Sequence, residues 1–405
     1  MSNGDSHHAH IVIGGGISGV TAAHYAQRAG IDTLLLESGS RLGGCMHTHA
    51  FPELDGYWVE GGSHSCFNSY GNLLAIMEAL DLLSRATAKE KQGYRLWRGG
   101  ERKSILSALH PVELAVSLPG LLLRDKSRCS VAEYYGRGLG KRNYRDLFGP
   151  AFRSVICQPA DDYPAEALFR KKPRRKDVLR SFTMPDGLAE IPTRIAERTG
   201  FGVETDKSVS AVAAADSGFA LSLADGSERT CGALTLAVPP DVAARLLAGV
   251  AADAASVIEP VGVAEIDTLV LAFRAEDLAI EPLAGLISID GGFYSAVSRD
   301  FLSDSRYRGF AFHFPGDSVG DETQLAAACR ALDTSPDKVA ALHRLRNRLP
   351  RLRKGHQQLV ERLDQALAGR RIAVTGNWFL GVSIEDCVTR SRSEHERLFG
   401  PPQSR

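Results

Sequence analysis

Residues 9–44 read AHIVIGGGISGVTAAHYAQRAGIDTLLLESGSRLGG, and this stretch decides the fold. An apolar run ends at Ile13, and three glycines follow it at the spacing G-x-G-x-x-G: Gly14, Gly16 and Gly19. In such a loop the first glycine permits a tight turn, the second lets the backbone approach a pyrophosphate, and the third lets a helix pack closely on a strand. The glycine spacing alone is weak evidence, because glycine-rich loops are common.

The residues after the glycines complete a βαβ unit. We predict a helix over 18–29 that begins within the loop, and a second strand over 33–36 that ends on Glu37. The helix N-terminus offers N–H groups and a positive dipole end to phosphate, and an acid after the second strand accepts from ribose hydroxyls. Strand, helix, second strand and acid in register therefore predict dinucleotide binding.

The next residues distinguish nicotinamide from flavin. Residues 38–44 read SGSRLGG, which places Arg41 and the pair Gly43-Gly44 just beyond the acid. This continuation resembles the R-x-G-G sequence of the flavin amine oxidase superfamily, where it follows the first βαβ unit and contacts FAD. The glycines would let the chain pass against an extended cofactor, and Arg41 has forked donors that suit phosphate. The resemblance implies FAD.

Composition agrees with a globular cofactor enzyme. The 405 residues suit two or three domains, and Lys+Arg and Asp+Glu both number 48, so no net charge argues for a nucleic-acid partner. Seven scattered cysteines without C-x-x-C spacing indicate reduced thiols. His7, His8 and His10 are interpreted as a solvated tail, with metal binding as the alternative, and no metal site is predicted. Without an apolar signal sequence or membrane span, we expect a cytoplasmic protein.

Nucleotide-binding signals recur in three blocks that two insertions separate. We assign residues 8–88, 181–247 and 365–405 to an FAD-binding domain, whose apolar strands indicate a parallel sheet covered on both faces. Residues 89–180, mainly helical in pattern, and 248–364 are assigned to a substrate domain. The predicted fold class is α/β, a Rossmann-type FAD-binding domain with an inserted α+β substrate domain.

The last block narrows the resemblance. Residues 375–388 read TGNWFLGVSIEDCV, which resembles the G-N-x-x-x-G-V-x-I-x-D-C sequence of protoporphyrinogen and coproporphyrinogen oxidases, where it runs past the flavin ring into a helix. The segment AVPP at 237–240 and the turn GGER at 99–102 resemble further parts of those enzymes. Within the superfamily, the chain thus resembles the porphyrinogen-oxidising branch.

Two departures from that family stand next to the motifs. Cys45 occupies a position that is usually basic; we interpret it as a packing residue, with a flavin–thioether bond as the alternative. Residues 389–393 read TRSRS where the family has small residues, so the helix either carries charge near the pyrophosphate or tilts. The chain is also short for that family, which predicts a trimmed substrate domain.

Motifs and resemblance together define the predicted site. The cofactor-binding positions are Gly14, Gly16, Ile17, Ser18, Gly19, Glu37, Ser38, Arg41, Gly43, Gly44, Cys45, Val209, Gly376, Asn377, Gly381 and Val382. The candidate substrate-binding residues are Trp378, Phe379 and Tyr294, with core packing as the alternative for each aromatic. No catalytic side chain is assigned, because the flavin carries the chemistry.

The predicted function is an FAD-dependent oxidoreductase, protoporphyrinogen-oxidase-like, that takes hydride from a porphyrinogen, pyrrole-like or cyclic amine substrate to flavin N5. Two alternatives stay open: a flavin amine oxidase that forms an imine in secondary metabolism, and a flavin-binding subunit without catalysis. Besides a small-molecule substrate, the partner would be dioxygen or another electron acceptor.

Two further segments bear on larger partners. Residues 170–176 read RKKPRRK, either a solvated loop or an attraction for a substrate carboxylate, a carrier protein or anionic lipid. Residues 105–123 carry apolar side chains at helical spacing, interrupted by Pro111 and Pro119. Related oxidases have membrane-docking helices there, so peripheral contact with the inner membrane face and plain core packing both remain open.

We predict that the purified protein carries tightly bound, non-covalent FAD. Acid precipitation should release the flavin into the supernatant, where its absorption is measured. Colourless protein that FAD cannot reconstitute would contradict the assembled motif, whereas flavin in the precipitate would support a covalent link such as one through Cys45.

Overall fold

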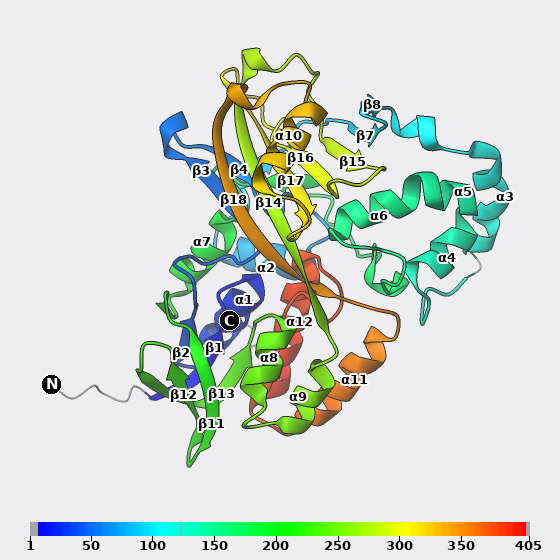
Figure 1. The fold of residues 1–405 in the computed structure, drawn as a ribbon. Helices are drawn as coiled ribbons and strands as arrows, with labels where there is room; N and C mark the ends of the chain where they lie inside the picture. The colour runs from blue at the N-terminus through cyan, green and yellow to red at the C-terminus, as the bar shows by residue number, and fades with distance from the viewer. Residues whose placement is uncertain (1–6, 123, 402–405) are drawn as a thin grey trace.

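The computed structural model describes residues 7–122 and 124–401, and Figure 1 shows two main sheets, one above the other. The lower sheet contains the predicted βαβ unit. Strand β1 (His7–Ile13) pairs in parallel with β2 (Thr33–Leu36), and helix α1 (Ile17–Arg28) connects them. The predicted unit is therefore confirmed, with the helix shifted by one residue at each end.

Segments from distant parts of the chain extend this sheet. Three further strands form parallel pairs. Strand β10 (Gly202–Glu204) pairs with β2, β13 (Glu228–Leu236) pairs with β1, and β19 (Ile372–Val374) pairs with β13. The antiparallel strands β11 (Val209–Ala215) and β12 (Gly218–Leu223) continue the sheet from the first half of β13. The α/β class and the Rossmann-type sheet built from three sequence blocks are thus confirmed.

Helices cover both faces of the lower sheet, because alternate side chains of each strand point to opposite faces. Val12 belongs to one apolar cluster, while Ile11 and Ile13 belong to another, and all three are buried. The helices that contribute to the Val12 cluster are α1, α2 (Gly71–Ala79), α7 (Glu190–Thr199) and α12 (Ile384–Phe399). Those that contribute to the other cluster include α8 (Pro240–Leu247), α9 (Ala252–Ile258) and α11 (His356–Leu367).

The upper sheet is largely antiparallel, in the order β18-β14-β17-β16-β15-β7-β8. Its strands are β7 (Tyr94–Arg98), β8 (Glu101–Lys103), β14 (Gly262–Arg274), β15 (Gly285–Ser288), β16 (Ser295–Ser298), β17 (Tyr307–Pro315) and β18 (Val339–Arg351). The long pair β14 and β18 descends from this sheet to the lower domain (Figure 1). These two strands therefore link the two sheets physically.

The remaining elements lie around the upper sheet and at the junction. Helix α10 (Asp321–Ala331) belongs to the upper half, and the helices of the first insertion are α3 (Pro111–Leu122), α4 (Val131–Gly138), α5 (Lys141–Asn143) and α6 (Gly149–Ile156). Two small sheets are made by β3 (Thr48–Phe51) with β4 (Tyr57–Glu60), and by β9 (Ser181–Thr183) between β5 (Cys66–Phe67) and β6 (Thr87–Ala88).

The apolar segment of the first insertion divides between core and surface. Leu114 and Leu121 pack against the core, whereas Val112 and Val116 are 77% and 78% exposed. Pro111 begins α3 and Pro119 lies inside it, so neither proline ends the helix; residue 123 lies outside the described part. Among the described residues, no helix is both long enough and apolar enough to cross a membrane.

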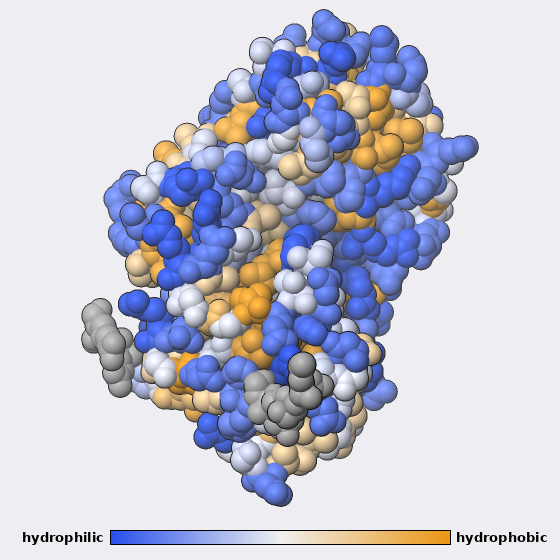
Figure 2. All heavy atoms as spheres, turned by 90° about the vertical axis from the view of Figure 1, so that its left-hand side faces the viewer, coloured by the Kyte–Doolittle hydropathy of each residue, from blue (hydrophilic) through white to orange (hydrophobic). Residues whose placement is uncertain are grey.

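Figure 2 shows the side of the molecule on which α7 lies. On this side, a strip of apolar side chains is visible at the junction of the two sheets and below it.

The packing of α1 on the glycine loop generates a stability prediction. A Cβ on Gly19 would lie 1.8 Å from the carbonyl oxygen of Gly14, so Gly19→Ala must push the helix away from the strand. We expect a lower melting temperature, a loss of unfolding free energy of about 1–3 kcal/mol, and reduced flavin content. The matched control is Gly120→Ala in α3, where a Cβ meets nothing within 4 Å and should stabilise the helix slightly. Equal behaviour of the two variants would contradict the close approach.

Candidate cofactor and active site

A cavity of about 270 Å³ lies between the glycine loops, the C-terminal loop and the ends of β14 and β18. Twelve of the predicted cofactor positions line it: Gly14, Gly16, Ile17, Ser18, Glu37, Ser38, Gly43, Gly44, Cys45, Gly376, Asn377 and Val382. These residues come from three distant parts of the sequence. The carboxyl edge of a parallel sheet is where a doubly wound fold binds its ligands.

The two glycine loops are in direct backbone contact. Gly16 and Gly43 form an isolated parallel bridge, and the Gly43 N–H donates to the carbonyl of Gly15 at 2.8 Å. A Cβ on Gly44 would lie 3.1 Å from the Cα of Gly16, whereas a Cβ on Gly16 meets nothing nearer than the Gly44 Cα at 3.9 Å. Gly16 therefore presents bare backbone to the cavity, where a side chain would take up space.

The N-terminus of α1 suits a phosphate. No side chain caps it, and its first turn contains no acidic residue. The unneutralised positive end of the helix dipole lies beside Gly16, Ile17 and Ser18, which line the cavity. This end of the cavity therefore fits the pyrophosphate of a dinucleotide.

Glu37 holds the glycine loop while it faces the cavity. Its carboxylate accepts from the backbone N–H of Gly15 at 2.6 Å and of Gly39 at 2.7 Å, and from the Ser38 hydroxyl at 3.2 Å. A carboxylate has about four acceptor positions, so it retains capacity for a ribose hydroxyl. The predicted acid therefore stabilises the turn, and its contact with a ribose stays a prediction.

The Arg41 guanidinium, expected to bind phosphate, donates instead to carbonyl groups of its own loop. Its guanidinium donates to the carbonyls of Leu42, Gly44 and Met46 at 2.9–3.3 Å and does not line the cavity. These donors hold the second glycine loop in its turn. Phosphate binding by Arg41 stays a prediction that would require those bonds to open.

Cys45 lines the cavity as a free thiol. Burial raises the pKa of the thiol, and the nearby Arg41 guanidinium only partly opposes this effect. Since the thiolate is the nucleophile, a protonated thiol is poorly suited to form a flavin–thioether bond. The Cys45 carbonyl accepts from the Ser63 N–H at 2.9 Å, which brings Ser63 into the cavity wall.

The aromatic side chains of the C-terminal loop do not line the cavity, although other residues of this loop do. Trp378 is fully buried, its ring stacks on Phe379 at 4.2 Å, and its indole N–H donates to the Val238 carbonyl at 3.3 Å. Both rings belong to the apolar core, and neither lines the cavity. Tyr294 is also absent from the wall, so substrate binding by these three aromatics stays a prediction.

Three more predicted cofactor-binding positions do not line the cavity, and each is packed against other parts of the protein. Val209 is buried in the core at the start of β11. Gly19 packs against Gly14, and a Cβ on Gly381 would lie within 3 Å of Asp386 and the Ala167 carbonyl. Their predicted contact with the cofactor is untested by this geometry.

The unusual charge on α12 is neutralised away from the cavity. Arg390 is buried and pairs with Asp364 at 2.6 Å and Glu394 at 2.9 Å, while its guanidinium stacks on Phe379 at 4.1 Å. On the other side, the small Ser391 donates to the Ser18 carbonyl at 2.8 Å, which lets α12 pack closely on α1. The helix therefore keeps a small residue where it meets the glycine loop.

Sequence reasoning missed the part of the wall that the substrate sheet supplies. Val263 comes from the start of β14, and Arg348, Leu349 and Pro350 come from the end of β18. No local motif marks these positions. Met46, Ser63, Ile384 and Cys387 also line the cavity beside predicted residues, as do residues 237–240, whose AVPP sequence was a usable signal.

The basic segment 170–176 is partly anchored to the C-terminal loop. Arg170 donates to the Leu380 carbonyl at 3.1 Å, and Lys172 pairs with Asp386 at 2.8 Å. Arg175 pairs with Glu78 and Asp177. Half of its charges are thus engaged in the fold, and contact with a larger partner stays a prediction.

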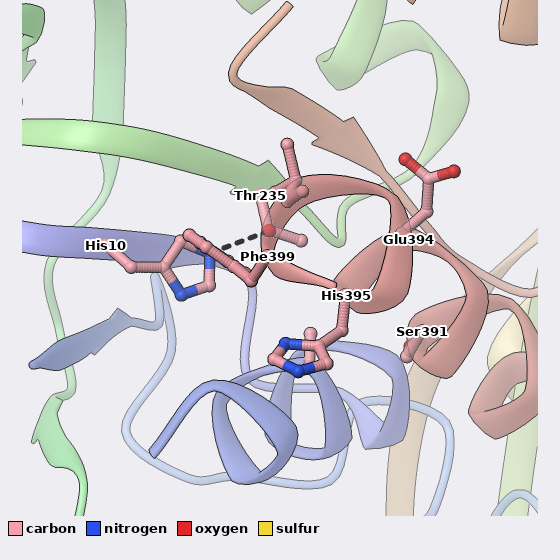
Figure 3. Close-up of a pocket in the computed structure, with 8 residues that line it drawn as sticks. His10, Thr235, Ser391, Glu394, His395 and Phe399 are labelled. Atoms are coloured by element: carbon pink, nitrogen blue, oxygen red, sulfur yellow. Dashed lines mark hydrogen bonds between the residues drawn. The ribbon is translucent and has the colours of Figure 1, made fainter. Parts of the chain in front are cut away.

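A second hollow beside α12 is a packing gap. His10 lies buried in β1 and bonds to Thr235 at 2.8 Å, while His395 faces it from α12 (Figure 3). Burial and the neighbouring His395 lower the pKa of His10 to about 3. The hollow has no room for a ligand, and the interpretation of His10 as part of a solvated tail is wrong because β1 carries it into the core.

Two family models match the chain. Residues 12–80 match the NAD(P)-binding Rossmann-like domain, and residues 123–320 match the flavin containing amine oxidoreductases. The second match covers just under half of the chain and makes this part similar to the flavin amine oxidase family. The match to a flavin-containing family supports FAD as the cofactor that the lining residues would hold, and it supports an FAD oxidoreductase as the class of activity.

Solved structures of the same fold can be aligned with nearly the whole of this chain. A protein of Exiguobacterium sp. 255-15, provisionally named a protoporphyrinogen oxidase, is 19% identical with a TM-score of 0.77 and 98% of each chain covered. Putrescine oxidase bound to putrescine is 14% identical, with a TM-score of 0.70 over 96% of this chain and 98% of its own. Reduced UDP-galactopyranose mutase is 14% identical, with a TM-score of 0.72 over 97% and 96%. The near-complete coverage of the first protein means that this chain is not trimmed relative to it.

Curated relatives match only short stretches. A 15-cis-phytoene desaturase of Narcissus pseudonarcissus is 36% identical over 80 residues, and a pseudooxynicotine dehydrogenase of Pseudomonas sp. is 51% identical over 53 residues. These stretches are 20% and 12% of this chain and only 14% and 11% of the relatives' own length. Their activities therefore enter only as proposals.

The contacts of Glu37 predict a selective loss of cofactor affinity. Glu37→Gln removes the charge that accepts from two backbone N–H groups and faces the cavity, which should cost about 1.5–3 kcal/mol, or roughly ten- to a hundredfold in FAD affinity. The matched control is Glu204→Gln, which removes a charge paired with Arg229 at the end of the neighbouring strand β10. FAD titration of the apoprotein measures both. Equal affinity of Glu37→Gln and wild type would contradict this role.

Proposed function

We propose that this protein oxidises a porphyrinogen, pyrrole-like or cyclic amine metabolite by removing hydride from a carbon at which a nitrogen lone pair stabilises the resulting cation. The observation that carries the proposal is the mixed wall of the cavity. Glycine loops that suit a dinucleotide line the same space as residues 348–350 of the substrate sheet. Cofactor and substrate would therefore meet inside one cavity.

The ionisable groups of the wall suit this reaction. The described residues that line the cavity include Glu37, Arg348 and two cysteines as ionisable groups, but no lysine or histidine. When hydride leaves an amine with the electron pair of the C–H bond, the nitrogen lone pair forms a C=N bond to the same carbon. In a porphyrinogen the methylene carbon that loses hydride forms a C=C bond to the pyrrole, whose nitrogen forms a C=N bond within the ring. In both cases an N–H proton is released. Bound FAD would supply the hydride acceptor and later pass two electrons to dioxygen or another acceptor. A protein base is then not required to start the reaction.

Arg348 gives the proposed substrate end a positive charge. Its guanidinium lies 2.7 Å from the carboxylate of Asp241 and 4.0 Å from that of Glu265, and the side chain is about one-third exposed. A substrate carboxylate would compete with these acids for the guanidinium. This favours an acidic tetrapyrrole precursor over a purely cationic amine.

Amine oxidation to an imine is the second candidate. It is supported by the extended likeness to putrescine oxidase, although an identity of 14% carries the fold alone. A flavin-binding subunit without catalysis is the remaining alternative.

The test is anaerobic reduction of the FAD-loaded protein by a panel of porphyrinogens, cyclic amines and polyamines, followed by flavin absorption. We expect bleaching by porphyrinogens. Arg348→Gln should weaken reduction by substrates with carboxylates by roughly ten- to a hundredfold in apparent affinity, with unchanged flavin content. The matched control, Arg344→Gln, lies on the same strand, pairs with Asp321 and does not line the cavity. Bleaching by polyamines alone would select the second candidate, and no bleaching by any compound would favour the subunit.

A further inference from the structure

Three histidines meet where the β3–β4 hairpin packs on β18. His47 precedes β3, His49 lies within it, and His343 comes from the middle of β18. One ring nitrogen from each histidine can be chosen so that all three lie within 4.8 Å of one another. The rings of His49 and His343 are parallel with centroids 3.7 Å apart, and the centroids of His47 and His343 are 6.1 Å apart. Residues separated by almost three hundred positions are thus brought together.

Packing alone does not explain this cluster. The histidines His24, His110 and His313 bond to Thr199, Asp146 and Thr268 at 2.7–3.0 Å. By contrast, none of the three clustered rings hydrogen-bonds to any described residue, although each is half-buried. Their nitrogens therefore remain available at a half-buried position.

We propose that His47, His49 and His343 form a binding site for a first-row divalent metal ion, with Zn²⁺ as the best fit. Three imidazoles without a carboxylate suit Zn²⁺, Cu²⁺ and Ni²⁺ more than Mg²⁺ or Ca²⁺. Three protein nitrogens would leave one tetrahedral position for water. The inference does not depend on the substrate proposed above.

The geometry requires a modest rearrangement of side chains. Zn–N bonds of about 2.0–2.1 Å in a tetrahedron place the nitrogens roughly 3.3–3.4 Å apart, closer than the outer limit of 4.8 Å in this structure. One of the two stacked rings must also turn, because parallel rings do not aim at a common point. Metal binding therefore requires rotation about the side-chain bonds of these histidines.

Burial holds the three rings in their neutral form near neutral pH. Burial lowers the pKa of His47 to about 4, and Arg41, His343 and His49 add to this effect. The pKa values of His49 and His343 are lowered as well, chiefly by burial. Neutral imidazole is the form that donates a lone pair to a metal, so no proton has to be displaced near neutral pH.

The location gives the site a structural role. His47 lies two residues after Cys45 of the cavity wall, and its carbonyl accepts from the Gly61 N–H at 2.7 Å. His343 lies on the strand that ends with Arg348 in the same wall. A metal ion would therefore clamp the second glycine loop to the substrate sheet, outside the cavity itself.

The experiment uses the FAD-loaded, chelator-treated protein and titrates it with ZnCl₂ by calorimetry. We expect one ion per chain and a higher melting temperature in its presence. Co²⁺ in place of Zn²⁺ should give the visible absorption of a tetrahedral site. His343→Ala and His49→Ala should each weaken Zn²⁺ binding at least tenfold and remove the rise in melting temperature.

The matched control is the double variant His7→Ala/His8→Ala, which removes two other histidines near the surface, at the start of β1. It should bind Zn²⁺ like the wild type. Binding that this control abolishes while His343→Ala retains it would overturn the proposal, as would absence of binding to the wild type. Flavin content and circular dichroism identify folded variants, and His343→Asn, a smaller change of shape, replaces the alanine variant if that one does not fold.

Discussion

The hydrogen bonds of the Glu37 carboxylate are the interaction on which the site depends. One carboxylate joins the N–H groups of Gly15 and Gly39, and so holds the first glycine loop against the turn that follows β2. The bridge between Gly16 and Gly43 then brings the second loop against the first. Because β1 and β2 are parallel, both loops leave the same edge of the sheet, and a strip of bare backbone faces the cavity.

The second constraint is the attachment of the substrate sheet. The paired strands β14 and β18 continue from that sheet to the lower domain and deliver Val263 and residues 348–350 to the cavity. Opposite them, α12 packs on α1 through Ser391, while Arg390 is neutralised by Asp364 and Glu394 on the far side. The cavity is therefore enclosed by elements whose positions are fixed by packing elsewhere.

The differences from the sequence prediction follow one physical rule. Glycines, strand ends and the acid Glu37 act through the backbone nearby, so their spacing predicts their place. Arg41 is long and flexible, and the carbonyls of its own loop satisfy its donors. Trp378 lies within the expected loop, yet its ring turns into the core, where burial of a large apolar surface is favourable. Where a side chain points is decided by neighbours that no local pattern reveals.

The sequence by itself determined the βαβ unit, because that unit depends on periodicity and glycine spacing within a short segment. The resemblance of its motifs to a flavoprotein family implied FAD and gave the remaining positions among the twelve predicted residues that line the cavity. The tertiary structure alone decided that Arg348 faces those glycines, that Ser391 meets Ser18, and that His343 joins His47 and His49. These contacts join residues far apart in the chain, and they exist because strand pairing and helix packing bring distant segments to one place. Local propensity carries no information about such neighbours, so only the folded chain reveals them.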